Sequence, residues 1–191
     1  MTSESAVVSV FGGQAVARGS DDYEQARRLG RRLAEQGFVL CTGGYGGTME
    51  AVSRGAKEAG GRTIGVTVDL FGATPPNDWV DEVENTASLL LRLDKLTVLG
   101  DAFVIVRGGV GTLLELALVW NLVMLGASPS KPIVVVGRAW HAVLARMEET
   151  LTLTGRHLDL LMLVDDVDQA VSALLAWREQ REEQAARGAA R

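Results

Sequence analysis

The stretch "AFVIVRGGVGTLLELALVW", residues 102–120, passes from a short apolar run through a glycine-rich turn into a longer apolar segment. Residues 102–106 are mostly β-branched or aromatic and predict a buried strand. The glycines that follow predict a tight turn, and residues 111–125 then predict a helix. A strand, a glycine turn and a helix in this order form the repeating unit of parallel α/β sheets. This stretch therefore decides the predicted fold class.

The same alternation recurs along the rest of the chain. Apolar runs predict strands at residues 6–11, 38–41, 63–68, 102–106 and 133–136, with a weaker one at 161–164. Helical patterns lie between them, at about 21–36, 47–59, 86–99, 111–125, 140–151 and 166–181. Continuously apolar strands indicate a parallel sheet that is covered on both faces. The sequence thus predicts an α/β fold, a single doubly wound, Rossmann-like parallel sheet with helices on both faces.

The chain shows no internal repeat and no linker between domains. We expect residues 1–178 to form one Rossmann-like nucleotide-binding domain and residues 179–191 to be a charged C-terminal tail without chemistry. The segment "DLFGATPPNDWVDEVEN", residues 69–85, is predicted to be an irregular loop because Pro75-Pro76 and Asn77-Asp78 mark turns. A loop of that length is often a lid or an oligomer contact.

Composition and charge exclude several classes of function. The net charge of −5 carries no electrostatic signature of a nucleic-acid partner. The N-terminal residues resemble no signal peptide and no apolar run approaches the ~18 residues of a membrane span, so we expect a cytoplasmic protein without a membrane partner. Cys41 lies in an apolar run and is expected in the core. His141 and His157 belong to no metal-ligand pattern, so neither a metal site nor a cofactor is expected.

Glycines cluster directly after three of the predicted strands. They are Gly12 and Gly13 after the first strand, Gly43, Gly44, Gly46 and Gly47 after the second, and Gly108, Gly109 and Gly111 after the fourth. In the strand order 3-2-1-4-5 these turns would line one crevice at the carboxyl ends of the strands, where such sheets bind ligands. Free helix N–H groups there suit a phosphate, and the Thr112 hydroxyl adds a further donor. For any single turn, however, glycine can equally serve a tight connection alone.

The glycine patterns match neither the dinucleotide fingerprint nor the P-loop, so a ligand with one phosphate fits better than a pyrophosphate. Three charged residues near these turns are candidates for chemistry. Glu115 interrupts an almost unbroken apolar segment, Glu50 lies three residues after Gly47, and Arg92 lies in a leucine-rich helix. Each also has a simpler interpretation. The two acids could only complement a helix dipole, and Arg92 could belong to a solvent-exposed face.

Four motifs resemble the LONELY GUY family of phosphoribohydrolases over residues 6–175. They are "FGGQ" (11–14), "GGYGGTMEAVSRGAKEAGG" (43–61), an arginine nine residues before "DAFVIV" (101–106), and "GGVGTLLE" (108–115). The resemblance implies hydrolysis of the N-glycosidic bond of a purine nucleoside 5′-monophosphate, a cytokinin riboside monophosphate or AMP, to free base and ribose 5-phosphate. It implies Arg92 and Glu115 as the catalytic pair and a homodimer or higher homo-oligomer. The substrate-binding residues would be the glycines above with Thr48, Glu50, Arg107 and Thr112.

The chain departs from the family pattern at positions that bear on its activity. Arg107 replaces the proline of the family motif, and Leu90 and Leu93 replace a histidine and a lysine beside Arg92. The extra positive charge of Arg107 would favour a more anionic ligand. Two alternatives therefore remain open. One is a non-enzymatic carrier of a phosphorylated ligand such as the molybdenum cofactor, a role known for related proteins of this fold. The other is a phosphate-binding regulatory domain without turnover.

Overall fold

The computed structural model describes residues 5–128, 131–153 and 155–189, and within them the strands form one seven-stranded parallel sheet. The strand order is β4-β3-β2-β1-β5-β6-β7. The strands are β1 (Val7–Phe11), β2 (Val39–Thr42), β3 (Thr63–Val68), β4 (Glu82–Thr86), β5 (Ala102–Ile105), β6 (Ile133–Val136) and β7 (Leu161–Val164). The predicted order 3-2-1-4-5 corresponds to β3-β2-β1-β5-β6 and is confirmed.

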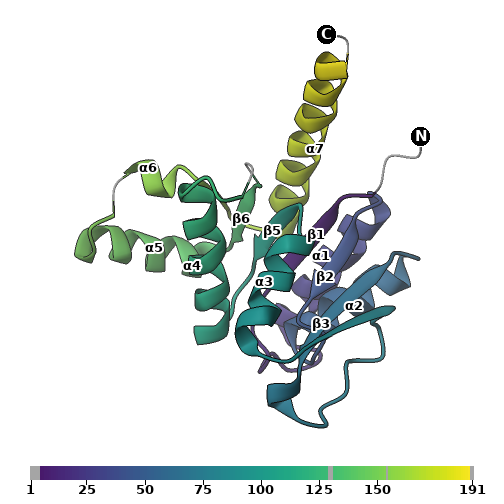
Figure 1. Ribbon diagram of the computed structural model, residues 1–191. Coiled ribbons are helices and arrows are strands. Elements are labelled where there is room, and N and C mark those ends of the chain that lie inside the picture. The colour runs from purple at the N-terminus through teal and green to yellow at the C-terminus, as the bar shows by residue number, and fades with distance from the viewer. Residues whose placement is uncertain (1–4, 129–130, 154, 190–191) are drawn as a thin grey trace.

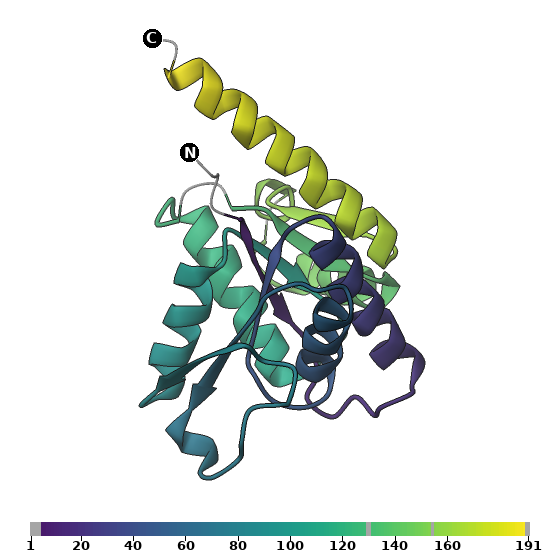
Figure 2. The same ribbon diagram turned by 90° about the vertical axis from the view of Figure 1, so that its right-hand side faces the viewer.

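Helices cover both faces of the sheet (Figure 1; Figure 2). On one face, α1 (Asp21–Glu35), α2 (Thr48–Glu58) and α7 (Val167–Ala189) pack on a core cluster that includes Val8 and Val10 of β1. On the other face, α3 (Leu89–Leu99), α4 (Val110–Met124) and α5 (Arg138–Thr150) pack on a cluster that includes Phe11. Two short elements, η1 (Asp69–Phe71) and α6 (Gly155–Leu158), lie in connections. The predicted doubly wound α/β sheet is therefore confirmed, and Cys41 is fully buried in it as expected.

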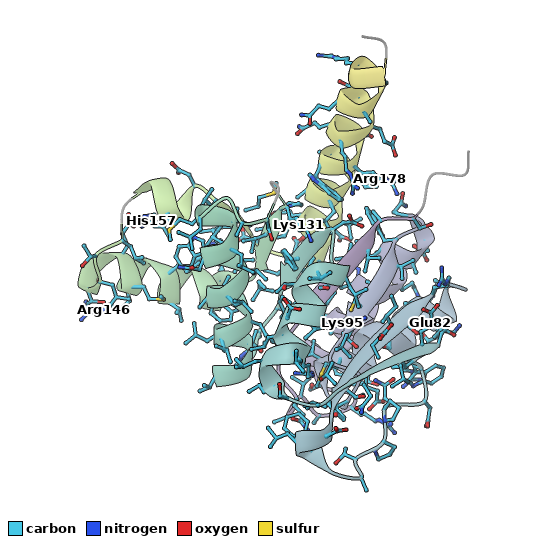
Figure 3. All side chains as sticks on the ribbon, in the orientation of Figure 1. Glu82, Lys95, Lys131, Arg146, His157 and Arg178 are labelled. Atoms are coloured by element: carbon cyan, nitrogen blue, oxygen red, sulfur yellow. The ribbon has the colours of Figure 1, made fainter. Side chains whose placement is uncertain are left out.

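The prediction that residues 69–85 are irregular throughout is wrong, because this segment contains η1 and the start of strand β4. β4 pairs with β3 at the edge of the sheet, and most of its side chains are exposed. The backbone ladder with β3 holds it in place, and exposed ion pairs flank it: Lys95 Nζ lies 3.2 Å from Glu84 Oε2, and Arg62 pairs with Glu82 (Figure 3 labels Lys95 and Glu82). An edge strand with exposed side chains needs no apolar run, and the sequence "EVENT" therefore lacks the expected signal.

Helix α7 continues to Ala189, so most of the predicted charged tail is helical. Its C-terminal part projects beyond the sheet, where charged side chains are hydrated (Figure 2). Residues 1–4, 190 and 191 of the predicted ranges lie outside the described residues. In the described part of the chain, none of the helices combines the length and apolarity needed to cross a membrane.

Candidate active site

The three glycine-rich turns meet at the carboxyl edge of the sheet. The backbone N–H of Gly13, after β1, donates to the carbonyl of Arg107, after β5, over 3.1 Å. The N–H of Thr48, the first residue of α2, donates to the carbonyl of Gly13 over 2.9 Å. The turns after β1, β2 and β5 therefore form one hydrogen-bonded unit, as the strand order predicts.

Two glycines in this unit are needed because other atoms approach their backbone closely. A Cβ on Gly43 would lie 1.8 Å from Nη2 of Arg92. Gly47 has a φ of 66°, and a Cβ there would lie 2.3 Å from the carbonyl oxygen of Gln14. A larger residue fits at neither position without moving backbone or the guanidinium. Packing between the turns is thus sufficient to explain why glycine occupies positions 43 and 47.

A cavity of about 420 Å³ opens beside these turns. The predicted site residues that line it are Gly12, Gly13, Arg92, Gly109, Gly111, Thr112 and Glu115. The lining that sequence reasoning missed comprises Gln14, Ala15, Tyr45, Met49, Phe71, Leu89, Leu93 and Leu114. Tyr45 and Met49 lie inside the glycine-rich motif of residues 43–61. The bulky Tyr45 between two glycines was a signal in the sequence that could have indicated a lining residue. Phe71 comes from the segment predicted as a loop, where no pattern marked it.

The buried guanidinium of Arg92 is fixed by backbone carbonyls. Its Nε donates to the carbonyl of Val66 over 2.8 Å, and its Nη2 donates to the carbonyl of Gly43 over 3.1 Å. The guanidinium also lies over the ring of Tyr45, 5.8 Å from its centroid. Burial lowers the pKa of Arg92 from its ordinary value, and the neighbouring Glu115 carboxylate opposes that shift. The structure thus corrects the interpretation of Arg92 as a solvent-exposed helix residue.

The carboxylate of Glu115 lies on the second turn of α4 and faces the guanidinium. Its Oε1 is 4.0 Å from Nη1 of Arg92, and its side chain is 13% exposed. Burial raises its pKa from 4.5 to about 7, against the opposing effect of Arg92. A carboxylate with a raised pKa and an arginine at this distance in a cavity is typical of a functional site. At neutral pH it can stabilise a developing positive charge or exchange a proton.

The N-terminus of α4 lines the cavity with groups that could hold an anion. Gly109 precedes the helix, and the N–H groups of Val110, Gly111 and Thr112 have no intrahelical partner by the geometry of a first turn. Gly109, Gly111 and Thr112 all line the cavity. Backbone N–H groups and the helix dipole at such a position favour a phosphate.

Other predicted ligand residues lie away from this cavity. The Glu50 carboxylate accepts from the Tyr23 hydroxyl over 2.9 Å and pairs with Arg18 Nε at 2.7 Å, so it links α2 to α1 and to the β1–α1 connection. Arg107 is exposed and pairs with Asp22 at 3.2 Å on the α1 side of the sheet. Neither side chain lines the main cavity, and Arg107 lines a separate cavity of about 140 Å³ together with Thr48. Gly43, Gly44, Gly46, Gly47, Thr48 and Gly108 belong to the turns behind the main cavity and do not line it.

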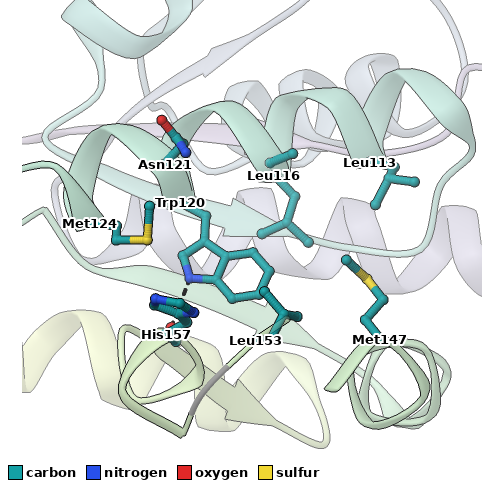
Figure 4. A pocket seen from close by; sticks show the side chains of 9 residues that line it. Leu113, Leu116, Trp120, Asn121, Met124, Met147, Leu153 and His157 are labelled. Carbon is teal, nitrogen blue, oxygen red and sulfur yellow. Dashed lines mark hydrogen bonds between the residues drawn. The ribbon is translucent and has the colours of Figure 1, made fainter. Parts of the chain in front are cut away.

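A further cavity, of about 200 Å³, lies on another side of α4 (Figure 4). Its lining is mainly apolar and includes Leu116, Trp120 and Met147. The indole N–H of Trp120 donates to the carbonyl of His157 over 2.8 Å. None of the predicted site residues lines it. In the described part of the chain, no group of three or more His, Cys, Asp or Glu side chains is arranged to hold a metal ion.

Comparison with known proteins places this chain in a family. Residues 5–162 match the SLOG cluster4 family. A cytokinin riboside 5′-monophosphate phosphoribohydrolase of Mycobacterium marinum is 32% identical over 160 residues, which cover 78% of this chain and 83% of the relative. A pyrimidine/purine nucleotide 5′-monophosphate nucleosidase of Escherichia coli is 30% identical over 141 residues, 69% of this chain and 31% of that enzyme.

Among solved structures, the molybdenum cofactor carrier protein of Chlamydomonas reinhardtii matches with a TM-score of 0.67 and 27% identity. The match covers 91% of this chain and 98% of the carrier. Relatives named as enzymes of nucleotide 5′-monophosphates and a relative named as a carrier thus share this fold. The chain belongs to the SLOG cluster4 family, and the resemblance to the LONELY GUY family that its motifs predicted is confirmed.

Proposed function

We propose that this protein hydrolyses the N-glycosidic bond of a purine nucleoside 5′-monophosphate and releases the free base and ribose 5-phosphate. The observation that carries the proposal is the pairing of Arg92 and Glu115, 4.0 Å apart, in one cavity with the N-terminus of α4. The activities named for the Mycobacterium marinum and Escherichia coli relatives support the same class of reaction.

In this proposal the 5′-phosphate binds the N–H groups at the start of α4. Glu115 follows Gly111 by one helical turn, so a sugar bound next to that phosphate lies beside the carboxylate. When the bond between C1′ and the base nitrogen breaks, its electron pair leaves with the base and C1′ becomes oxocarbenium-like. The Glu115 carboxylate stabilises that charge, and water then adds at C1′. One proton of the water is transferred to the base, so the atoms balance.

Arg92 has a positioning role in this scheme as well as an electrostatic one. Its bonds to the carbonyls of Val66 and Gly43 hold the guanidinium in place before substrate binds. A fixed guanidinium orients the carboxylate and the sugar at little further entropic cost. Binding energy from the remote phosphate helps to hold the reacting bond in place.

A substrate panel tests the proposal. Purified protein is incubated with AMP and with isopentenyladenosine monophosphate, and free base is followed by chromatography. The expected result is base release from at least one of them, and its loss in the Glu115→Gln variant. If no purine monophosphate yields free base, the proposal is wrong.

A second candidate is a carrier of a phosphorylated ligand, supported by the match to 98% of the Chlamydomonas reinhardtii carrier. It would use the same phosphate position at α4, and Leu93, which replaces the family lysine, would contact the ligand. Molybdenum or a fluorescent pterin that co-purifies with the protein would favour this carrier. Turnover of nucleotides by protein free of both would exclude it.

We further propose that the protein is a homo-oligomer that associates through α3 and α4. Both helices carry large exposed apolar side chains, with Leu90 77%, Val98 65% and Val110 85% exposed. Large apolar side chains left exposed on two helices of the same face of the sheet favour a contact between proteins. Sedimentation analysis checks the proposal. A dimer or larger species is expected, and Leu90→Glu should shift it toward monomer, whereas a monomeric wild-type protein would contradict the proposal.

A further inference from the structure

Part of the wall of the main cavity is aromatic, and its exposed ring comes from η1. Phe71 lines the cavity and is still 41% exposed. Its ring packs edge-on against Tyr45, with centroids 5.2 Å apart and an angle of 72° between planes. An exposed phenyl ring in a cavity leaves apolar surface for a flat ligand to cover.

This ring is held in position rather than carried on a free loop. The Tyr45 hydroxyl accepts from the N–H of Val68 over 2.9 Å, immediately before η1. The hydroxyl of Thr74 donates to the carbonyl of Phe71 over 2.9 Å, and the Asn85 amide donates to the carboxylate of Asp69 over 2.7 Å. The start of the short turn is therefore tied to Tyr45 and to β4, and its end is closed by a bond within the same connection. Stacking on a ring that is already ordered costs little further conformational entropy.

The groups along the cavity follow each other in a defined order. Glu115 lies one turn into α4 from the phosphate position and 4.0 Å from Arg92. The Arg92 guanidinium lies 5.8 Å from the centroid of Tyr45, whose ring contacts Phe71. The order is thus anion-binding helix end, charged pair, aromatic wall. It matches the order of phosphate, sugar and base in a nucleoside monophosphate.

We propose that Phe71 is the stacking surface for the base and that it makes the site prefer purines to pyrimidines. This inference rests on the proposed function, since it assigns the base end of the same site. Neighbouring lining residues Met49, Leu89 and Leu93 are apolar, and the Tyr45 hydroxyl is already bonded to Val68. Recognition at this wall therefore depends on the area of the flat ring, which is larger in a purine.

The test compares Phe71→Ala and Phe71→Leu with Leu70→Ala. Leu70 lies in the same turn, is 66% exposed and does not line the cavity, so it is a matched control. Phe71→Leu keeps most of the volume and removes the aromatic face, which separates stacking from shape. For each protein, kcat/KM is measured for AMP and CMP, together with the inhibition constant of ribose 5-phosphate, which has no base.

Loss of a base-stacking ring typically weakens binding by roughly 5- to 100-fold. Both Phe71 variants should lower kcat/KM for AMP within that range, mainly through KM, and lower that for CMP less. Ribose 5-phosphate should inhibit all variants equally, and Leu70→Ala should match wild type. Equal effects of Phe71→Ala and Leu70→Ala would overturn the proposal, as would an equal loss of ribose 5-phosphate binding.

Failure of the proposed function would look different. If the wild-type protein releases no base from any monophosphate, calorimetric binding of AMP and of ribose 5-phosphate replaces the kinetics. AMP affinity that falls in both Phe71 variants while ribose 5-phosphate affinity stays constant supports stacking without turnover. Unchanged AMP affinity in the Phe71 variants, or no binding of AMP by wild type, overturns it.

Discussion

The turns after β2 and β5 carry nearly the same local sequence, Gly-Thr-Met-Glu and Gly-Thr-Leu-Leu-Glu, yet they place their carboxylates in opposite surroundings. Glu50 follows Thr48 by two residues, and Glu115 follows Thr112 by three. One residue of spacing turns a side chain by about 100° around the helix axis. The helices α2 and α4 also cover opposite faces of the sheet, and Glu50 faces α1, where Tyr23 and Arg18 bind it, whereas Glu115 faces the cavity.

The comparison shows how a structural acid differs from a candidate catalytic one. The Glu50 carboxylate has a hydroxyl donor at 2.9 Å and a guanidinium at 2.7 Å. Glu115 has one cation at 4.0 Å and a pKa raised by burial to about 7. A carboxylate that is buried with so little compensation destabilises the fold, and such groups are typical of functional sites.

The largest effect is expected from removing the charge at the cavity. Glu115→Gln keeps the size of the side chain and removes the group that stabilises charge at C1′. Loss of one such electrostatic contact typically costs roughly 100- to 1,000-fold in kcat. Chromatographic rates of base release check this. Glu50→Gln is the matched control and should stay within about threefold of wild type, because the Glu50 side chain does not line the cavity and its change leaves the reacting groups in place. Similar losses of kcat in both variants would contradict the distinction between a catalytic Glu115 and a structural Glu50.

The two arginines give the next largest contrast. Arg92→Lys should lower kcat/KM by roughly 100-fold, because an ammonium cannot bond both carbonyls and face Glu115 at once. It should also lower the free energy of unfolding by about 1–3 kcal/mol, since the carbonyls of Val66 and Gly43 lose a donor. Arg107→Gln is the control at an exposed position, and nucleotide turnover close to wild type is expected. A larger loss of kcat/KM in Arg107→Gln than in Arg92→Lys would indicate that the phosphate binds on the α1 side of the sheet.

The raised pKa of Glu115 predicts the acid side of the pH profile. If the ionised carboxylate is required, kcat/KM should fall about tenfold per pH unit below the pKa of about 7. Steady-state rates between pH 5 and 9 in a buffer of constant ionic strength measure this limb. A profile that stays flat down to pH 5 would show that no group with this pKa controls the reaction.

The smallest expected effects are on the free energy of unfolding, and they should have opposite signs in Glu115→Gln and Glu50→Gln. Burial raises the pKa of Glu115 in the folded state from 4.5 to about 7. The contribution of Glu115 to stability is therefore fully present below pH 4.5, where the residue is protonated in both states, and it is lost as the pH rises toward 7. Glu115→Gln should therefore stabilise the protein by about 1–3 kcal/mol at pH 8 and by less at pH 5. Glu50→Gln should destabilise it by about 1 kcal/mol. Urea unfolding measures both, and destabilisation by Glu115→Gln at pH 8 would contradict the geometry.

Much of the fold could be predicted because the central strands are continuously apolar and the glycines mark where they end. β4 could not be predicted, because it lies at the edge of the sheet with most of its side chains exposed, which leaves no apolar pattern. Within the site, the glycine turns and Arg92 followed from motifs and spacing. The direction of Glu50 did not, because it depends on Tyr23 of another helix. Phe71 joins the cavity only through the path of the chain after β3, which no local signal encodes.

A crystal structure of the Glu115→Gln variant with AMP would test the central claim most directly. The account predicts the 5′-phosphate on the N–H groups of Gly111 and Thr112, and C1′ next to the side chain at position 115. It also predicts the guanidinium of Arg92 in its present place, bonded to the carbonyls of Val66 and Gly43. A phosphate bound to Arg107 on the α1 side, with C1′ remote from position 115, would contradict it.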